Sequence, residues 1–196
     1  QSRLTKVGDY YRLYAAMLAR DKDGVFCNFV VYSDDFGKQW KVLGDVNKGA
    51  VPRGGDEPKT EELPDGSILI SSRCGGGRYY NIFRFDNVET AEGSWGEMAF
   101  SGAKNNGVTA LNNSCNGEVM ILPVVRNEDG KQLYLALQSL PFGSGRSNVG
   151  IYYKELEDYK DFLTPAHFAK DWDGRYKSSI TSSAYSTMTM QADNSL

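Results

Sequence analysis

The chain has 196 residues with a formal net charge of -3, 40% hydrophobic residues and 12% aromatic residues. This content is high enough to bury a core, which excludes an intrinsically disordered chain. The acidic balance and the lack of any basic run give no sign of nucleic-acid binding, and no apolar run is long enough to span a membrane.

The few cysteines and the single histidine limit the chemistry open to the chain. Cys27, Cys74 and Cys115 are an odd number without C-x-x-C spacing, which argues against a dense disulfide framework and against a zinc cluster. His167 lies in a polar segment and is expected on the surface, which argues against a Ser-His-Asp triad and a two-histidine metal site. We therefore expect no metal ion and no cofactor.

Short strands separated by turns account for most of the chain. We expect a strand pair within residues 1–19, then strands at residues 25–32, 41–43, 67–72, 118–125, 131–137, 148–156 and 184–190, and a last turn at 192–195. The turns carry residues that turns favour, as in Pro64-Asp65-Gly66. Residues 158–173 change character and predict a short helix or an irregular insertion. Short strands recurring at roughly the spacing of blades favour a β-propeller over a sandwich.

The loop at residues 33–40, read SDDFGKQW, joins two of the predicted strands. We expect Asp35 to accept backbone N–H bonds within the loop, Gly37 to take a positive φ and Trp40 to pack beneath the loop. A calcium loop is the alternative, but the acidic ligand that such a loop needs further on is missing.

Residues 56–80 concentrate charge around a predicted hairpin. Glu61 and Glu62 precede its turn, and Arg73 and Arg78 follow its return strand, with Gly75-Gly76-Gly77 between the arginines. Acids and cations so arranged can meet at one rim of a sheet, and the glycines let the backbone pass close to a ligand. This arrangement suggests a site for an acidic substrate, and an ordinary solvated hairpin with a surface ion pair is the alternative.

Four blocks of the sequence resemble bacterial exo-α-sialidases (neuraminidases) that use a tyrosine nucleophile. The pattern S-x-D-x-G-x-x-W at residues 33–40 resembles the Asp box, which is a structural hairpin in that family. The other three blocks are Glu57-Pro58 to Glu62-Leu63 with Arg73 and Arg78, Leu137-Gln138-Ser139 to Gly145-Arg146-Ser147-Asn148, and Ser183-Ala184-Tyr185-Ser186. They resemble the family's glutamate block with its arginine, its last arginine and its nucleophile, in the same order.

The resemblance implies a role for each of four residues. Tyr185 would attack the anomeric carbon of sialic acid and Glu62 would accept its proton, giving a covalent sialyl-enzyme and retention. Arg78 and Arg146 would bind the carboxylate of the substrate as the second and third arginines of the family's triad. A neutral tyrosine avoids the repulsion that a carboxylate nucleophile would meet from that substrate.

Several assignments have rivals within the sequence. Glu61 competes with Glu62, and Arg73 competes with Arg78; the resemblance favours Glu62 and Arg78 and leaves Arg73 as a supporting residue. Without the resemblance, Tyr185 is a packing residue of a strand. Separately, Arg146 could be a turn residue, and Arg12, which echoes the family's first arginine without its proline, is interpreted as a strand residue.

The resemblance thus implies an all-β fold, a six-bladed β-propeller of which residues 1–196 form about three blades, truncated at both ends. The first triad arginine and the acid/base aspartate are expected before Gln1, so we expect the chain alone to be inactive and to be partnered by the missing N-terminal half. The whole domain would release sialic acid from glycoproteins, glycolipids or oligosaccharides, in a secreted, periplasmic or cell-surface bacterial setting. A non-catalytic propeller that binds glycans or proteins, and a trans-sialidase, are the alternatives.

Overall fold

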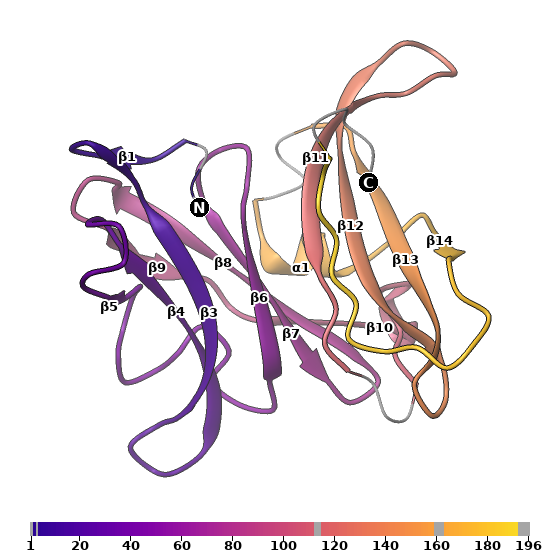
Figure 1. Ribbon diagram of the computed structural model, residues 1–196, viewed down its shortest axis with the longest axis horizontal. Coiled ribbons are helices and arrows are strands. Elements are labelled where there is room, and N and C mark those ends of the chain that lie inside the picture. The colour runs from indigo at the N-terminus through magenta and orange to yellow at the C-terminus, as the bar shows by residue number, and fades with distance from the viewer. Residues whose placement is uncertain (1, 3, 112–114, 159–162, 192–196) are drawn as a thin grey trace.

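The computed structural model describes residues 2, 4–111, 115–158 and 163–191, which form four antiparallel sheets (Figure 1). A small hairpin pairs β1 (Lys6–Val7) with β2 (Tyr10–Tyr11). The other sheets are β3 (Leu13–Arg20), β4 (Phe26–Ser33) and β5 (Lys41–Val42); β6 (Asp56–Glu62), β7 (Ile68–Cys74), β8 (Gly77–Asn87), β9 (Glu92–Trp95) and β10 (Ala99–Gly102); and β11 (Val119–Val125), β12 (Gln132–Gly143), β13 (Ser147–Leu156) and β14 (Gly174–Lys177). The prediction of an all-β chain is confirmed.

The sheet built on β6–β10 has a core on each of its faces, because alternate residues of β7 point in opposite directions. Ile68 and Ile70 pack in one cluster with residues of β4, such as Val30, whereas Leu69 packs in the other cluster with residues of β11–β13. Ile68, Leu69 and Ile70 are all fully buried. This two-sided burial explains why β7 begins with three consecutive apolar residues.

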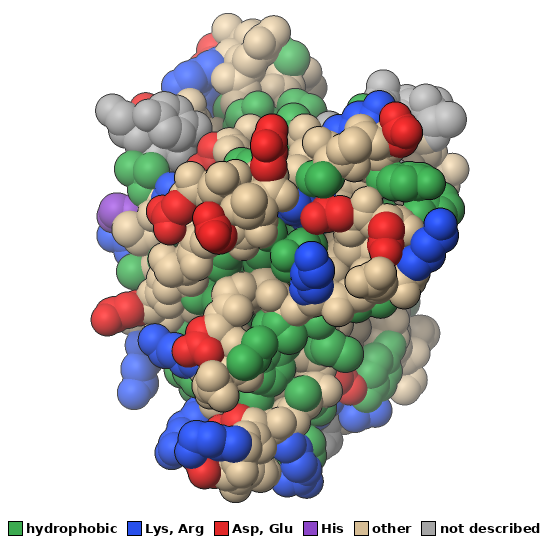
Figure 2. Space-filling model, turned by 90° about the vertical axis from the view of Figure 1, so that its left-hand side faces the viewer, with side chains coloured by type: hydrophobic (Ala, Val, Ile, Leu, Met, Phe, Trp, Pro, Cys, Tyr) green, Lys and Arg blue, Asp and Glu red, His purple; other side chains and the backbone are tan. Residues whose placement is uncertain are grey.

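The first strands of the three larger sheets, β3, β6 and β11, lie side by side near the middle of the molecule (Figure 1). The ends of β6 therefore lie close to the neighbouring sheets, so loops from different sheets can meet there. In the sheet of β3–β5, Met17, Leu18 and Phe26 are exposed. The face of the molecule drawn in Figure 2 carries hydrophobic side chains among charged ones.

The loop at residues 33–40 connects β4 to β5. The Ser33 hydroxyl donates to Asp35 Oδ1 at 2.8 Å, Asp35 Oδ1 accepts the Gln39 N–H at 2.9 Å, and Gly37 has a φ of 86°. These bonds confirm the expected role of Asp35. Trp40 contacts the loop, because its indole N–H donates to the Gly37 carbonyl at 3.1 Å, but the residue is 46% exposed and is not buried beneath the loop.

Two expectations for the C-terminal third are wrong. Residues 184–190 form no strand, and β14, which pairs with β13, was not predicted. Residues after β14 instead run as irregular chain past β11 (Figure 1). The turn expected at 192–195 lies outside the described residues.

The short helix expected in residues 158–173 is α1 (Pro165–Ala169). A 3-10 turn, η1 (Ala103–Asn105), follows β10. Thr164 caps α1 by accepting the His167 N–H, and His167 is exposed, as predicted. Among the described residues, no helix has the length and hydrophobicity to cross a membrane.

Candidate functional site

The β6–β7 hairpin brings a carboxylate and a guanidinium together at the end away from its turn. Arg73, near the end of β7, pairs across the sheet with Asp56, the first residue of β6. The register shifts between Asp56 and Lys59, and Glu57 has a φ of 39° within this irregularity. A bulge of this kind re-aims a side chain. Arg73 Nη1 lies 2.7 Å from Glu57 Oε2 and 3.6 Å from Asp56 Oδ2.

Tyr185 approaches the same carboxylate from the irregular C-terminal segment. Its hydroxyl donates to Glu57 Oε1 at 2.9 Å, so Tyr185 and Arg73 occupy different oxygens of Glu57. Tyr185 is 51% exposed. The Arg146 guanidinium carbon, from the turn between β12 and β13, lies 5.0 Å from the centroid of the Tyr185 ring. The structure thus brings Tyr185 and Arg146 together, as predicted.

The environment keeps Glu57 ionised. Burial raises the pKa of Glu57, but the hydrogen bonds from Arg73 and Tyr185, with the charge of Arg73, outweigh burial and hold the pKa below its usual range. Glu57 is therefore an anion at neutral pH that already accepts a hydrogen bond from a phenol, which is the geometry of a base beside a nucleophile.

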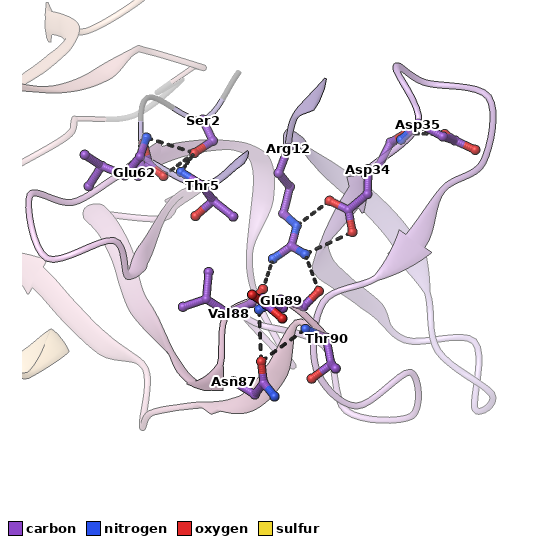
Figure 3. Close-up of polar contacts among 12 residues, drawn as sticks. Ser2, Thr5, Arg12, Asp34, Asp35, Glu62, Asn87, Val88, Glu89 and Thr90 are labelled. Carbon is purple, nitrogen blue, oxygen red and sulfur yellow. Dashed lines mark hydrogen bonds and ion pairs between the residues drawn. The ribbon is translucent and has the colours of Figure 1, made fainter. Parts of the chain in front are cut away.

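Glu62 does not take part in this arrangement, so the prediction that Tyr185 reaches Glu62 is wrong. Glu62 is the last residue of β6, at the end opposite to Glu57, and is 7% exposed. Its carboxylate accepts the Ser2 hydroxyl at 2.5 Å and the Leu4 N–H at 3.2 Å (Figure 3). Glu62 holds the N-terminal segment against the sheet.

Arg78 is also not on the accessible side of the site, so the prediction that it converges with Arg146 on one hollow is wrong. Its side chain is 1% exposed; Nε donates to the Ser71 hydroxyl at 3.0 Å and Nη2 to the Ser71 carbonyl at 3.3 Å. Arg73, expected only as support, is the arginine that meets Glu57. Nη1 of Arg78 is buried without a hydrogen-bond partner among the described residues.

The three glycines between the two arginines serve the hairpin and its packing, which corrects the expectation that they make room for a ligand. Gly76 takes a φ of 82° in the turn between β7 and β8. A Cβ at Gly77 would overlap the Ser101 carbonyl oxygen of β10. Only glycine therefore lets β10 lie against the start of β8.

Arg12 is a fully buried residue between β2 and β3 and lies in no strand, unlike the prediction. Its guanidinium makes two bonds to the Asp34 carboxylate, at 2.6 and 2.9 Å, and donates to the carbonyls of Val88 and Glu89 (Figure 3). These contacts join three loops on the side of the molecule that also holds Glu62. In the part of the chain that the structure describes, no group of three or more His, Cys, Asp or Glu side chains could hold a metal ion.

The residue that sequence reasoning missed is Glu57. Regular pairing outward from the turn at Pro64–Gly66 would put residue 57 opposite Arg73, but the structure pairs Arg73 with Asp56, and the register shift brings the Glu57 carboxylate to Arg73. A match to the glutamate block by spacing alone passed over this pairing. Searches of protein-family models and of curated proteins found no match for the chain.

Proposed function

We propose that this chain supplies the nucleophile side of a retaining exo-α-sialidase, with Tyr185 as nucleophile and Glu57 as its base. The observation that carries the proposal is the 2.9 Å hydrogen bond from the Tyr185 hydroxyl to Glu57, whose second oxygen is fixed by Arg73 at 2.7 Å. A phenol of ordinary pKa, about 10, needs an adjacent base to act as a nucleophile near neutral pH.

In the proposed reaction, the Tyr185 oxygen forms a bond to the anomeric carbon while the bond from that carbon to the aglycone oxygen breaks. The phenolic proton passes to Glu57 Oε1, and a separate acid protonates the leaving oxygen. Water then attacks the anomeric carbon and gives up a proton to the conjugate base of that acid, the bond to Tyr185 breaks, and Glu57 returns its proton to the phenol. Two displacements at one carbon give net retention.

The charges around Tyr185 favour a substrate that carries a carboxylate. Arg146 lies over the phenol ring, and no carboxylate lies within ion-pair distance of it in the described ranges. A guanidinium in this position can bind a carboxylate with two parallel hydrogen bonds. A tyrosine adds no negative charge where the substrate brings its own, which is the reason a neutral nucleophile suits sialic acid.

The arrangement of sheets supports a β-propeller as the architecture around this site. β3, β6 and β11 each begin a sheet and lie together, as the inner strands of successive blades do. We propose that the three larger sheets are three blades of a six-bladed ring, with the site where chain segments from two of these sheets meet.

The test is Tyr185→Phe in the intact protein, with Tyr176→Phe as the matched control. Tyr176 lies in β14 and is 68% exposed, and the structure shows no contact between Tyr176 and the site. Release of sialic acid from an α-sialoside should fall by at least about 100-fold in Tyr185→Phe and stay near the wild-type value in Tyr176→Phe. Transfer of sialic acid to an added glycan would indicate a trans-sialidase. Binding of sialosides without turnover by the wild-type protein would indicate a glycan-binding module.

A further inference from the structure

We infer that Cys115 is a positioning residue for Tyr185, an inference that rests on the proposed function. The Tyr185 backbone N–H donates to Cys115 Sγ across 3.1 Å. Cys115 is 1% exposed and is a free thiol. The thiol thus contacts the same residue whose hydroxyl meets Glu57, from the side opposite to the solvent.

Tyr185 needs such an anchor because its backbone conformation is unfavourable. Its φ is 55°, in the left-handed region that a bulky residue rarely adopts. Such conformations persist only where the surroundings hold them in place. Tyr185 also lies in a segment without strand structure, and the nearest backbone hydrogen bond of this segment, from the Ser183 N–H to the Arg146 carbonyl at 2.9 Å, is two residues away.

The contacts that follow Tyr185 along the chain do not replace this anchor. The Ser186 hydroxyl donates to the Ser139 hydroxyl at 2.8 Å, and the Thr187 hydroxyl donates to Glu118 Oε2 at 3.0 Å. Both bonds are made by side chains and leave rotation about the Tyr185 backbone open. Only the bond to Cys115 fixes the Tyr185 amide itself among the hydrogen bonds of the described chain.

Cys115 is itself held firmly, which an anchor requires. Two residues later, a Cβ at Gly117 would overlap the Ser139 carbonyl oxygen of β12. The backbone after Cys115 therefore lies in direct contact with β12. The Tyr185 amide is thus linked to the sheet of β11–β14 through the irregular chain that leads from Cys115 into β11.

Loss of the hydrogen bond to Cys115 should slow the chemical step without weakening substrate binding. The backbones of Arg146 and Arg73 belong to the β12–β13 turn and to β7, so we expect loss of the Cys115 bond to change their positions less than that of Tyr185. The Tyr185 oxygen would shift relative to Glu57 and to the anomeric carbon. A misplacement of about 1 Å can lower a rate on the order of 100-fold. We therefore expect an effect on kcat with little effect on KM.

The experiment compares Cys115→Ala, Cys115→Ser and Cys27→Ala in the intact protein. Cys27 is a fully buried thiol in β4, where its Sγ contacts the Ala19 carbonyl, so it controls for loss of a buried thiol as such. We expect kcat to fall on the order of 10- to 100-fold in Cys115→Ala with KM within about twofold. Cys115→Ser, which keeps an acceptor, should recover most of kcat, and Cys27→Ala should keep it.

A second readout does not depend on turnover. In protein labelled with ¹³C at the tyrosine ring carbon that bears the hydroxyl, the Tyr185 signal, assigned by its loss in Tyr185→Phe, should move in Cys115→Ala and not in Cys27→Ala. If no variant and no wild-type protein releases sialic acid, the proposed function fails and this signal alone decides the inference. If Cys115→Ala does not fold, Cys115→Val replaces it. An unchanged kcat together with an unchanged Tyr185 signal would overturn the inference.

Discussion

The sharpest prediction contrasts two glutamates at opposite ends of β6. Glu57→Gln removes the negative charge that accepts bonds from Tyr185 and Arg73 but keeps the size of the side chain. Glu62→Gln makes the same chemical change where the carboxylate accepts bonds from Ser2 and Leu4. One substitution should affect turnover and the other should affect stability.

The magnitudes follow from these contacts. A general base contributes about 10²- to 10⁴-fold, so Glu57→Gln should raise the activation free energy by about 3–5 kcal/mol. Glu62 is 7% exposed, and hydrogen bonds to a charged acceptor contribute about 1.5–3 kcal/mol. Since an amide oxygen can still accept one of them, Glu62→Gln should lower the free energy of unfolding by about 1–3 kcal/mol.

The assay measures kcat and KM for release of sialic acid from an α-sialoside, with urea unfolding of each variant. Glu57→Gln should lose kcat and remain folded at the assay temperature. Glu62→Gln should keep kcat wherever it is folded. If Glu62→Gln lost turnover while Glu57→Gln kept it, the assignment of Glu57 as the base would be wrong.

Two further predictions concern stability. Leu69→Ala removes a fully buried side chain between two sheets and should lower the free energy of unfolding, measured in urea, by about 2–5 kcal/mol. Leu18→Ala, at a 39% exposed position of β3, should lower it clearly less. Equal losses in the two variants would contradict the two-sided core. Burial raises the pKa of Glu57, but its bonds to Arg73 and Tyr185 lower it to a folded-state value below the unfolded one. Its carboxylate therefore stabilises the fold above about pH 4.3, and this contribution is lost as pH falls through the folded-state pKa. The stability difference between wild type and Glu57→Gln should shrink from about pH 6 to about pH 3; a difference independent of pH would refute the sign.

Local sequence patterns predicted several of the strands because turn residues set their limits, whereas β8, β9 and β10 were not predicted. The Pro64–Gly66 turn fixes the β6–β7 hairpin, and the backbone of the loop at residues 33–40 closes on Asp35 as expected. These features depend on contacts between residues a few positions apart. The exposure of Trp40 was not predictable in this way, since it depends on whether another segment covers the loop.

The candidate site was predicted only in part because its geometry depends on departures from regular structure. The bulge after Asp56 and the positive φ of Glu57 decide which glutamate faces Arg73, and neither follows from alternation along a strand. Tyr185 was expected on a strand, where its side chain would point to one face. Its backbone N–H instead donates to Cys115, seventy residues earlier in the chain, a contact that no local pattern reveals.

The pairing of two arginines explains why an acid is required at this point of the sheet. Arg73 and Arg78 lie directly opposite each other across β7 and β8, where like charges are destabilising. Arg78 cannot turn away into solvent, because it is buried and bonded to Ser71. Burial lowers the pKa of Arg78, but a guanidinium stays charged at neutral pH. Glu57 offsets this repulsion by pairing with Arg73 at 2.7 Å, and it also interacts electrostatically with Arg78. The carboxylate that accepts the Tyr185 proton in our proposal is thus held ionised by a structural need of the hairpin. A buried Arg78 contributes to the charge of the site without touching the substrate.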